Sequence, residues 1–107
     1  MQERLERLMT HIGSEKTYLF DGYYRIRENN LGQIEIAYLK PDGCGTTSVN
    51  PQLTLELVEG KLIPVKLMDM GKSPNVFLKR DASNGDLLDR ELQDLLKRFE
   101  VAIENKN

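Results

Sequence analysis

The stretch Leu53-Thr54-Leu55-Glu56-Leu57-Val58-Glu59-Gly60-Lys61-Leu62-Ile63-Pro64-Val65-Lys66-Leu67 decides the fold of this chain. Leucines at every second position before Gly60 have the period of a half-buried strand. The same period resumes after Gly60 with Ile63, Val65 and Leu67. The sequence therefore predicts a β-hairpin over residues 53–67.

A three-residue loop, Glu59-Gly60-Lys61, would place both apolar sets on one face, because paired residues of antiparallel strands share a face. The predicted pairs are Leu57 with Ile63, Leu55 with Val65 and Leu53 with Leu67. Pro64 then lies on the outer face of its strand. Since proline cannot donate a ladder hydrogen bond, we expect a strand edge or a bulge there.

Length and composition are those of a single domain over residues 1–107. The chain is 39% hydrophobic and 30% charged, which is typical of a globular protein. Its net charge of -2 gives no global basic field that would attract nucleic acid or an anionic membrane. The single cysteine, Cys44, excludes an internal disulfide and a multi-thiolate metal site.

The first residues are charged and lack the apolar core of a signal peptide. No apolar run approaches the roughly 20 residues that span a bilayer. We therefore expect a cytoplasmic protein that does not enter the membrane.

Two amphipathic helices are predicted at either end of the chain. The first has Leu5, Leu8, Met9 and Ile12 on one stripe, with Gly13 suited to end it. The second has a longer apolar stripe, formed by Leu88, Leu92, Leu95, Leu96, Phe99 and Ile103. Ser83 and Asp86 resemble a capping box at its start.

A second hairpin is predicted around Asp21-Gly22, a dipeptide that favours two-residue loops. Its pairs would be Phe20 with Tyr23, Leu19 with Tyr24 and Tyr18 with Arg25. One face would then carry Leu19, Tyr24 and Ile26, and the other Tyr18, Phe20, Tyr23, Arg25 and Arg27. The alternative is a loop over 18–22 with the strand beginning at Tyr23.

The remaining segments complete an antiparallel meander. A turn over 29–32 leads into a strand over 33–39 with Ile34, Ile36 and Tyr38 inward. Residues 43–48 form a loop or a weak edge strand, and residues 76–78 form a last short strand. The predicted fold is α+β: an N-terminal helix, an antiparallel β-meander of four to six strands, and a long C-terminal amphipathic helix packed on the sheet.

Residues 50–103 resemble a group of small uncharacterised bacterial domains carried on plasmids, phages and other mobile elements. The resemblance consists of Asn50-Pro51 before Leu53-Thr54-Leu55-Glu56, then Ile63-Pro64-Val65, Gly71, and the closing helix with Leu92, Leu95 and Phe99. This chain differs from that group in having no tryptophan and a more polar stretch before Asn50. The resemblance implies an α+β fold and assigns no function and no site residue.

No residue pattern predicts catalysis, a cofactor or a metal. His11, the only histidine, has no nucleophile beside it in sequence, so a surface position is the simpler interpretation. Cys44 has only Lys40 nearby to lower its pKa, and no helix follows it. The glycines of 43–48 lead into a strand and not into the helix that a phosphate loop requires. Asp81, Asp86 and Asp89 do not match a calcium loop.

The best candidate site is the group Tyr18, Phe20, Tyr23, Arg25 and Arg27, because tyrosine and arginine are enriched at the centres of protein interfaces. The same residues could stack bases and contact phosphates, with Lys72, Lys79 and Arg80 extending the basic region. They could also be structural, with the aromatics covered by the second helix and the arginines paired with Glu28 or Glu35. We predict a non-enzymatic accessory, adaptor or inhibitor protein that binds another protein or a second copy of itself as a homodimer. A nucleic-acid-binding factor is the alternative.

Overall fold

The computed structural model describes residues 2–19, 21–41, 47–71 and 74–105. It has an N-terminal helix, six antiparallel strands and a long C-terminal helix, so the predicted α+β fold is confirmed. The elements are α1 (Gln2–Met9), β1 (Thr17–Leu19), β2 (Gly22–Glu28), β3 (Ile34–Pro41), β4 (Thr47–Val58), β5 (Lys61–Asp69), β6 (Val76–Lys79) and α2 (Gly85–Glu104).

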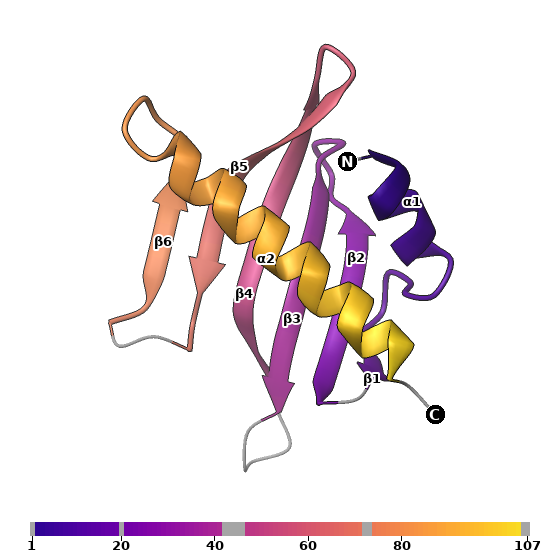
Figure 1. Cartoon of the computed structure of the whole chain (residues 1–107). Coiled ribbons are helices and arrows are strands. Elements are labelled where there is room, and N and C mark those ends of the chain that lie inside the picture. The colour runs from indigo at the N-terminus through magenta and orange to yellow at the C-terminus, as the bar shows by residue number, and fades with distance from the viewer. Residues whose placement is uncertain (1, 20, 42–46, 72–73, 106–107) are drawn as a thin grey trace.

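Strand order in the sheet follows the chain, β1-β2-β3-β4-β5-β6, and every neighbouring pair is antiparallel. Figure 1 shows α2 crossing one face of this sheet diagonally, with α1 lying beside β2. Leu5 and Leu8 of α1 are buried in the same cluster as the apolar stripe of α2, so both helices pack on one face. The sheet therefore has one face covered by helix and one face that neither described helix covers.

The covered face holds the core. Tyr24 of β2, Ile36 of β3 and Leu53 of β4 are completely buried in one cluster with the apolar stripe of α2. Phe99 of α2 meets the Tyr24 ring edge-on, with the ring centroids 4.8 Å apart. The predicted stripe of α2 is confirmed, with Ala102 as a further buried member.

The predicted loop of the β4–β5 hairpin is wrong. Glu59 and Gly60 form a two-residue turn, with φ angles of 50° and 80°, so Val58 pairs with Lys61 and Leu57 with Leu62. Two positive φ angles in succession match the twist of a hairpin, and glycine adopts one of them without strain. The turn moves Ile63 to the outer face, whereas Leu62 and Pro64 are buried.

A bulge restores the predicted register further down the same hairpin. Leu55 pairs with Pro64 and Thr54 pairs with Lys66, so Val65 is the extra residue. Beyond the bulge, Leu53 pairs with Leu67 as predicted. The expected disruption near Pro64 is thus a bulge in a strand paired on both sides, β4 and β6, and not a sheet edge.

The β1–β2 hairpin is also shifted relative to the prediction. Tyr18 pairs with Tyr23 and Leu19 pairs with Gly22, so the predicted pairs are wrong by two residues. Because side chains alternate with a period of two, a shift of two residues leaves every side chain on its predicted face. Leu19, Tyr24 and Ile26 are accordingly buried together.

The predicted helix ends differ from the observed ones. Helix α1 ends at Met9, four residues before Gly13, and Met9 is half exposed although Leu5, Leu8 and Ile12 are buried. Asn84 precedes α2, and its side chain makes no capping hydrogen bond. The Ser83 hydroxyl donates instead to Asp81 Oδ1 at 2.7 Å, so the predicted capping box is wrong.

Candidate functional site

Most residues of the uncovered sheet face, called the open face, lie in three rows across the strands, and the pair Glu56 and Ile63 extends this face toward the β4–β5 turn. The first row is Tyr18, Tyr23, Leu39 and Val49; the second is Arg25, Ala37, Gln52, Met68 and Phe77; the third is Arg27, Glu35, Thr54, Lys66 and Lys79. Each row joins paired residues of neighbouring strands, and these residues alternate along the strands with the buried residues under α2.

The structure brings together four of the five predicted site residues. Tyr18, Tyr23, Arg25 and Arg27 lie on the open face, and Phe20 lies outside the described residues. The second helix therefore does not cover Tyr18 and Tyr23, because it packs on the opposite face over Tyr24 and Tyr38. Tyr18 remains 59% exposed.

Of the three residues expected to extend the basic region, only Lys79 is placed on the open face by the described part of the chain. Arg80 contacts α2 through Asp89 Oδ1 at 2.9 Å and donates to the Pro64 carbonyl at 3.2 Å, so its predicted place in the patch is wrong. Lys72 and Cys44 lie outside the described residues, as does most of segment 43–48. His11 lies away from the open face, in a cleft of about 360 Å³ between α1 and α2 that Arg7 and Glu104 also line.

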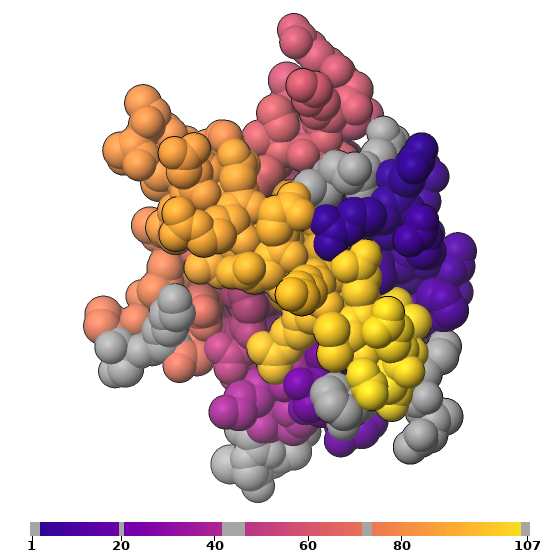
Figure 2. All heavy atoms as spheres, in the orientation of Figure 1, coloured from indigo at the N-terminus to yellow at the C-terminus, as the bar shows by residue number. Residues whose placement is uncertain are grey.

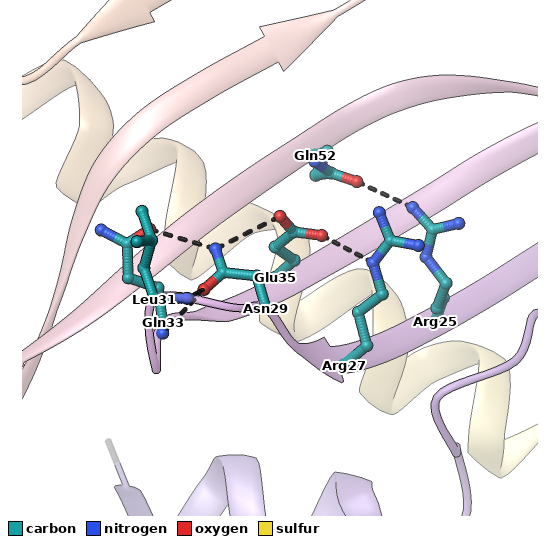
Figure 3. Close-up of polar contacts among 7 residues, drawn as sticks. All are labelled: Arg25, Arg27, Asn29, Leu31, Gln33, Glu35 and Gln52. Carbon is teal, nitrogen blue, oxygen red and sulfur yellow. Dashed lines mark hydrogen bonds and ion pairs between the residues drawn. The ribbon is translucent and has the colours of Figure 1, made fainter.

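The two arginines of β2 have different partners, as Figure 3 shows. Arg27 Nε forms an ion pair with Glu35 Oε1 at 2.6 Å, and Glu35 also accepts from the Asn29 amide. Burial raises the pKa of Glu35, but the hydrogen bond and charge of Arg27 outweigh this effect, so the pKa lies below its ordinary value. Arg27 is thus largely neutralised within the sheet, which agrees with the predicted pairing to Glu35.

Arg25 forms no such ion pair within the described residues. Its Nη2 donates to the neutral Gln52 Oε1 at 2.8 Å, and its Nε is buried without a hydrogen-bond partner in the structure. Burial lowers the pKa of the Arg25 guanidinium, and the neighbouring charge of Arg27 lowers it further. Arg25 nevertheless stays charged at neutral pH, so this part of the open face favours an incoming anion.

The other end of the open face has a hollow with an apolar wall and two lysines. It has a volume of about 420 Å³, and the open-face residues that line it are Gln52, Thr54, Lys66, Met68, Phe77 and Lys79. Phe77 is 60% exposed although it faces Met68 across the β5–β6 pair. The side chains of Lys66 and Lys79 form no ion pair or hydrogen bond within the described residues.

The sequence reasoning missed Lys66, Met68 and Phe77. Residue parity along the predicted hairpin placed Lys66 on an outer face, which was a usable signal. Nothing in the sequence, however, gave the register of β6 against β5, and this register sets Phe77 beside Met68 and Lys79 beside Lys66.

Charge is unevenly distributed over the molecule. Four cations of the three rows, Arg25, Arg27, Lys66 and Lys79, are opposed by Glu35 within the rows and by Glu56 beyond Thr54 on the same face. The net charge of the whole chain is nevertheless -2. The open face is therefore basic on an acidic protein, and a surface of this kind selects partners by local and not by total charge.

The comparisons with known proteins add no family to this description. Protein-family models, curated protein sequences and solved structures gave no significant match to the chain. The resemblance to plasmid- and phage-borne domains therefore stays a prediction. Within the described residues, no helix has a stretch apolar enough to cross a membrane, and no three His, Cys, Asp or Glu side chains are grouped as metal ligands would be.

Proposed function

We propose that this chain is a non-catalytic binding protein whose open face holds an acidic segment of another protein. The observation that carries the proposal is the combination of cations without an anionic partner, among the described residues, with an exposed apolar hollow on the same sheet face. An apolar side chain of the partner would fill the hollow beside Met68 and Phe77. Its carboxylates would meet Lys66, Lys79 and the guanidinium of Arg25, which forms no ion pair within the described residues.

Ring geometry supports a protein partner over single-stranded nucleic acid. Base stacking needs an accessible aromatic face. The Lys16 ammonium, however, lies 4.8 Å from the centroid of the Tyr23 ring, over its face. Tyr18 and Tyr23 also pack edge to face, with their centroids 5.2 Å apart and an interplanar angle of 73°. These contacts cover one face of the Tyr23 ring. Tyr18 and Phe77 are both exposed, and Phe77 is the one that lies beside the apolar hollow and can anchor an apolar side chain of a partner.

An accessory role in a larger system is consistent with such a surface. Phe77 and Met68 beside the hollow are of the residue types enriched at the centre of a protein interface, and Lys66 and Lys79 would lie at its rim. The resemblance of residues 50–103 to domains from bacterial mobile elements supports an adaptor, or an inhibitor that occupies the binding surface of another protein.

Peptide selection tests the proposal and does not require the partner to be identified first. A phage-displayed random peptide library is panned on the wild-type protein and depleted on the variant Phe77→Ser/Lys79→Glu. We expect the surviving peptides to combine aspartate or glutamate with a large apolar residue. Fluorescence anisotropy of a labelled peptide should show at least about tenfold weaker binding to Arg25→Gln and to Lys79→Glu. The matched control Arg90→Glu, which reverses an exposed charge on α2, should bind unchanged.

The same variants discriminate nucleic acid from protein. A labelled oligo(dT) 20-mer is titrated at low and at physiological salt, because phosphate contacts weaken steeply with salt. If the oligonucleotide binds tightly and this binding requires Arg25 and Lys79, the ligand of the open face is single-stranded nucleic acid and not a protein. If neither ligand depends on the open face, the proposed function is wrong.

A further inference from the structure

The β4–β5 hairpin projects from one end of the molecule, and its tip is apolar. In Figure 2 this tip stands clear of the surrounding surface. Leu57 is 55% exposed and Val58 is 39% exposed, although leucine and valine are residues that folding normally buries. Leu57 pairs with Leu62 and keeps the predicted helix side of the strand, where a hollow of about 340 Å³ separates it from Leu5 and Met9 of α1. Its predicted face is therefore confirmed, but its predicted burial is wrong.

Carboxylates flank these two aliphatic side chains. Glu56 precedes them and Glu59 follows them, and both are exposed. Glu59 forms no hydrogen bond or ion pair within the described residues, whereas Glu56 accepts a long hydrogen bond, 3.4 Å, from Gln33 Nε2. Lys61, across the turn, offsets one of the two charges. The tip is therefore a projecting apolar segment with a small acidic excess.

The open face is proposed to bind a segment of this kind, which combines apolar side chains with carboxylates. We infer that the hairpin tip of one copy docks on the open face of a second copy, with Val58 in the hollow beside Met68 and Phe77. Leu57, the adjacent residue of the strand, points to the other side of the hairpin and would contact the rim of the surface. Glu56 and Glu59 would then approach Lys66 and Lys79, the two open-face lysines that lack a partner in the described part of the chain. The inference rests on the proposed function, since it names a second copy as one partner of the same surface.

Charge favours this head-to-tail contact over a symmetric one. Two open faces stacked about a twofold axis would bring Lys66, Lys79 and Arg25 against their own copies, with Glu35 already paired to Arg27. Two tips placed together would likewise oppose Glu56 and Glu59 to themselves. Like charges that are brought together at an interface are unfavourable. A contact between two different surfaces either propagates or closes into a ring, because each copy keeps one tip and one face free.

The contact should be weak, because one hairpin tip covers much less area than the roughly 1,200 to 2,000 Å² of a stable interface. Sedimentation velocity of the wild-type chain from about 1 µM to about 1 mM should therefore show association that grows with concentration. A tip variant, Leu57→Thr/Val58→Thr, and a face variant, Phe77→Ser/Lys79→Glu, should each shift this association to at least about tenfold higher concentration. The matched control Leu87→Ser/Arg90→Glu changes an exposed apolar residue and a charge on α2, and it should behave as wild type.

Mixing the two variants gives the decisive result. The tip variant keeps an intact face and the face variant keeps an intact tip, so an equimolar mixture should form a 1:1 dimer that cannot grow further. A wild-type chain that stays monomeric over the whole range would overturn the inference, as would wild-type association without dimer in the mixture. If selected peptides still bind the open face in either case, the proposed function stands although the self-association is wrong. If neither self-association nor peptide binding is found, both the inference and the proposed function are wrong.

Discussion

The two faces of the sheet consist of alternating residues of the same strands, and they differ in charge and in the exposure of their large side chains. The face under α2 has Tyr24, Ile36 and Leu53 with no exposed surface, and it is completed by Phe99 from the helix. The open face has cations, a hollow and the exposed ring of Phe77. The difference shows that the two helices, chiefly α2 with a contribution from Leu5 and Leu8 of α1, decide which face is structural, and the other face is left free for binding.

Two phenylalanines test this division most directly. Phe99→Ala should lower the free energy of unfolding by about 3–5 kcal/mol, because it leaves a cavity against Tyr24 in the core. Phe77→Ala should change it by less than about 0.5 kcal/mol, because the ring is mostly exposed. Urea unfolding followed by circular dichroism measures both. Equal costs for the two substitutions would mean that the open face is also part of the core.

A pair of glycines tests how tightly the covered face is packed at its edge. A Cβ at Gly22 would lie 2.6 Å from Cε1 of Tyr38, whose ring is fixed by a hydroxyl bond to the Asp21 carbonyl and by Arg98 stacked at 3.7 Å. Gly22→Ala should therefore cost about 1–3 kcal/mol of unfolding free energy. Gly13→Ala, where nothing lies within 4 Å of the new Cβ, serves as the control and should be close to neutral. A neutral Gly22→Ala would show that the Tyr38 ring moves freely.

The covered face should also show an alkaline pH dependence, because it holds the hydroxyl of Tyr24. Burial raises the pKa of the Tyr24 hydroxyl, and its 2.7 Å hydrogen bond to Asp21 raises it further. The stabilisation is complete below the unfolded pKa of about 10. It declines at higher pH, because the unfolded chain then loses a proton that the folded chain keeps.

This dependence is isolated by comparing the wild type with Tyr24→Phe from pH 7 to pH 11. At neutral pH the variant should be less stable by about 1 kcal/mol, the value of one hydrogen bond. The difference should narrow above about pH 10. Subtraction removes the titration of the other tyrosines and of the lysines. A difference that stays constant up to pH 11 would show that burial does not perturb Tyr24.

Face assignments on β2 and β4 were predictable from the sequence, whereas the registers, and with them the faces of Ile63 and Pro64 on β5, were not. Residue parity placed Tyr18, Tyr23, Arg25 and Arg27 together, and it survived a two-residue error in the β1–β2 pairing. In the β4–β5 hairpin, the predicted odd loop and the observed two-residue turn with a bulge at Val65 both bring Leu53 opposite Leu67. Alternation alone cannot separate these solutions, because a bulge changes parity in the same way as an extra loop residue.

The candidate site was only partly predictable for a similar reason. The arginine side of the open face lies within one sequence segment, whereas the lysine side needs the pairing of β5 with β6, which are separated by a loop. Arg80 shows the reverse error. It adjoins Lys79 in sequence, but it lies beyond the end of β6, where its side chain contacts Asp89 of α2. Charge clusters in sequence are therefore weak guides to charge clusters on a surface.

The order of elements along the chain has a consequence for synthesis. Consecutive strands are neighbours in the sheet, so each hairpin can form as soon as its own residues leave the ribosome. Helix α2 follows all six strands, so the apolar face of the sheet stays exposed to solvent until the helix has been synthesised. At translation rates of about 5–20 residues per second, this exposure lasts on the order of a second or more. A stalled or truncated product that lacks α2 would present both sheet faces to other chains and would be a target for chaperones and proteases.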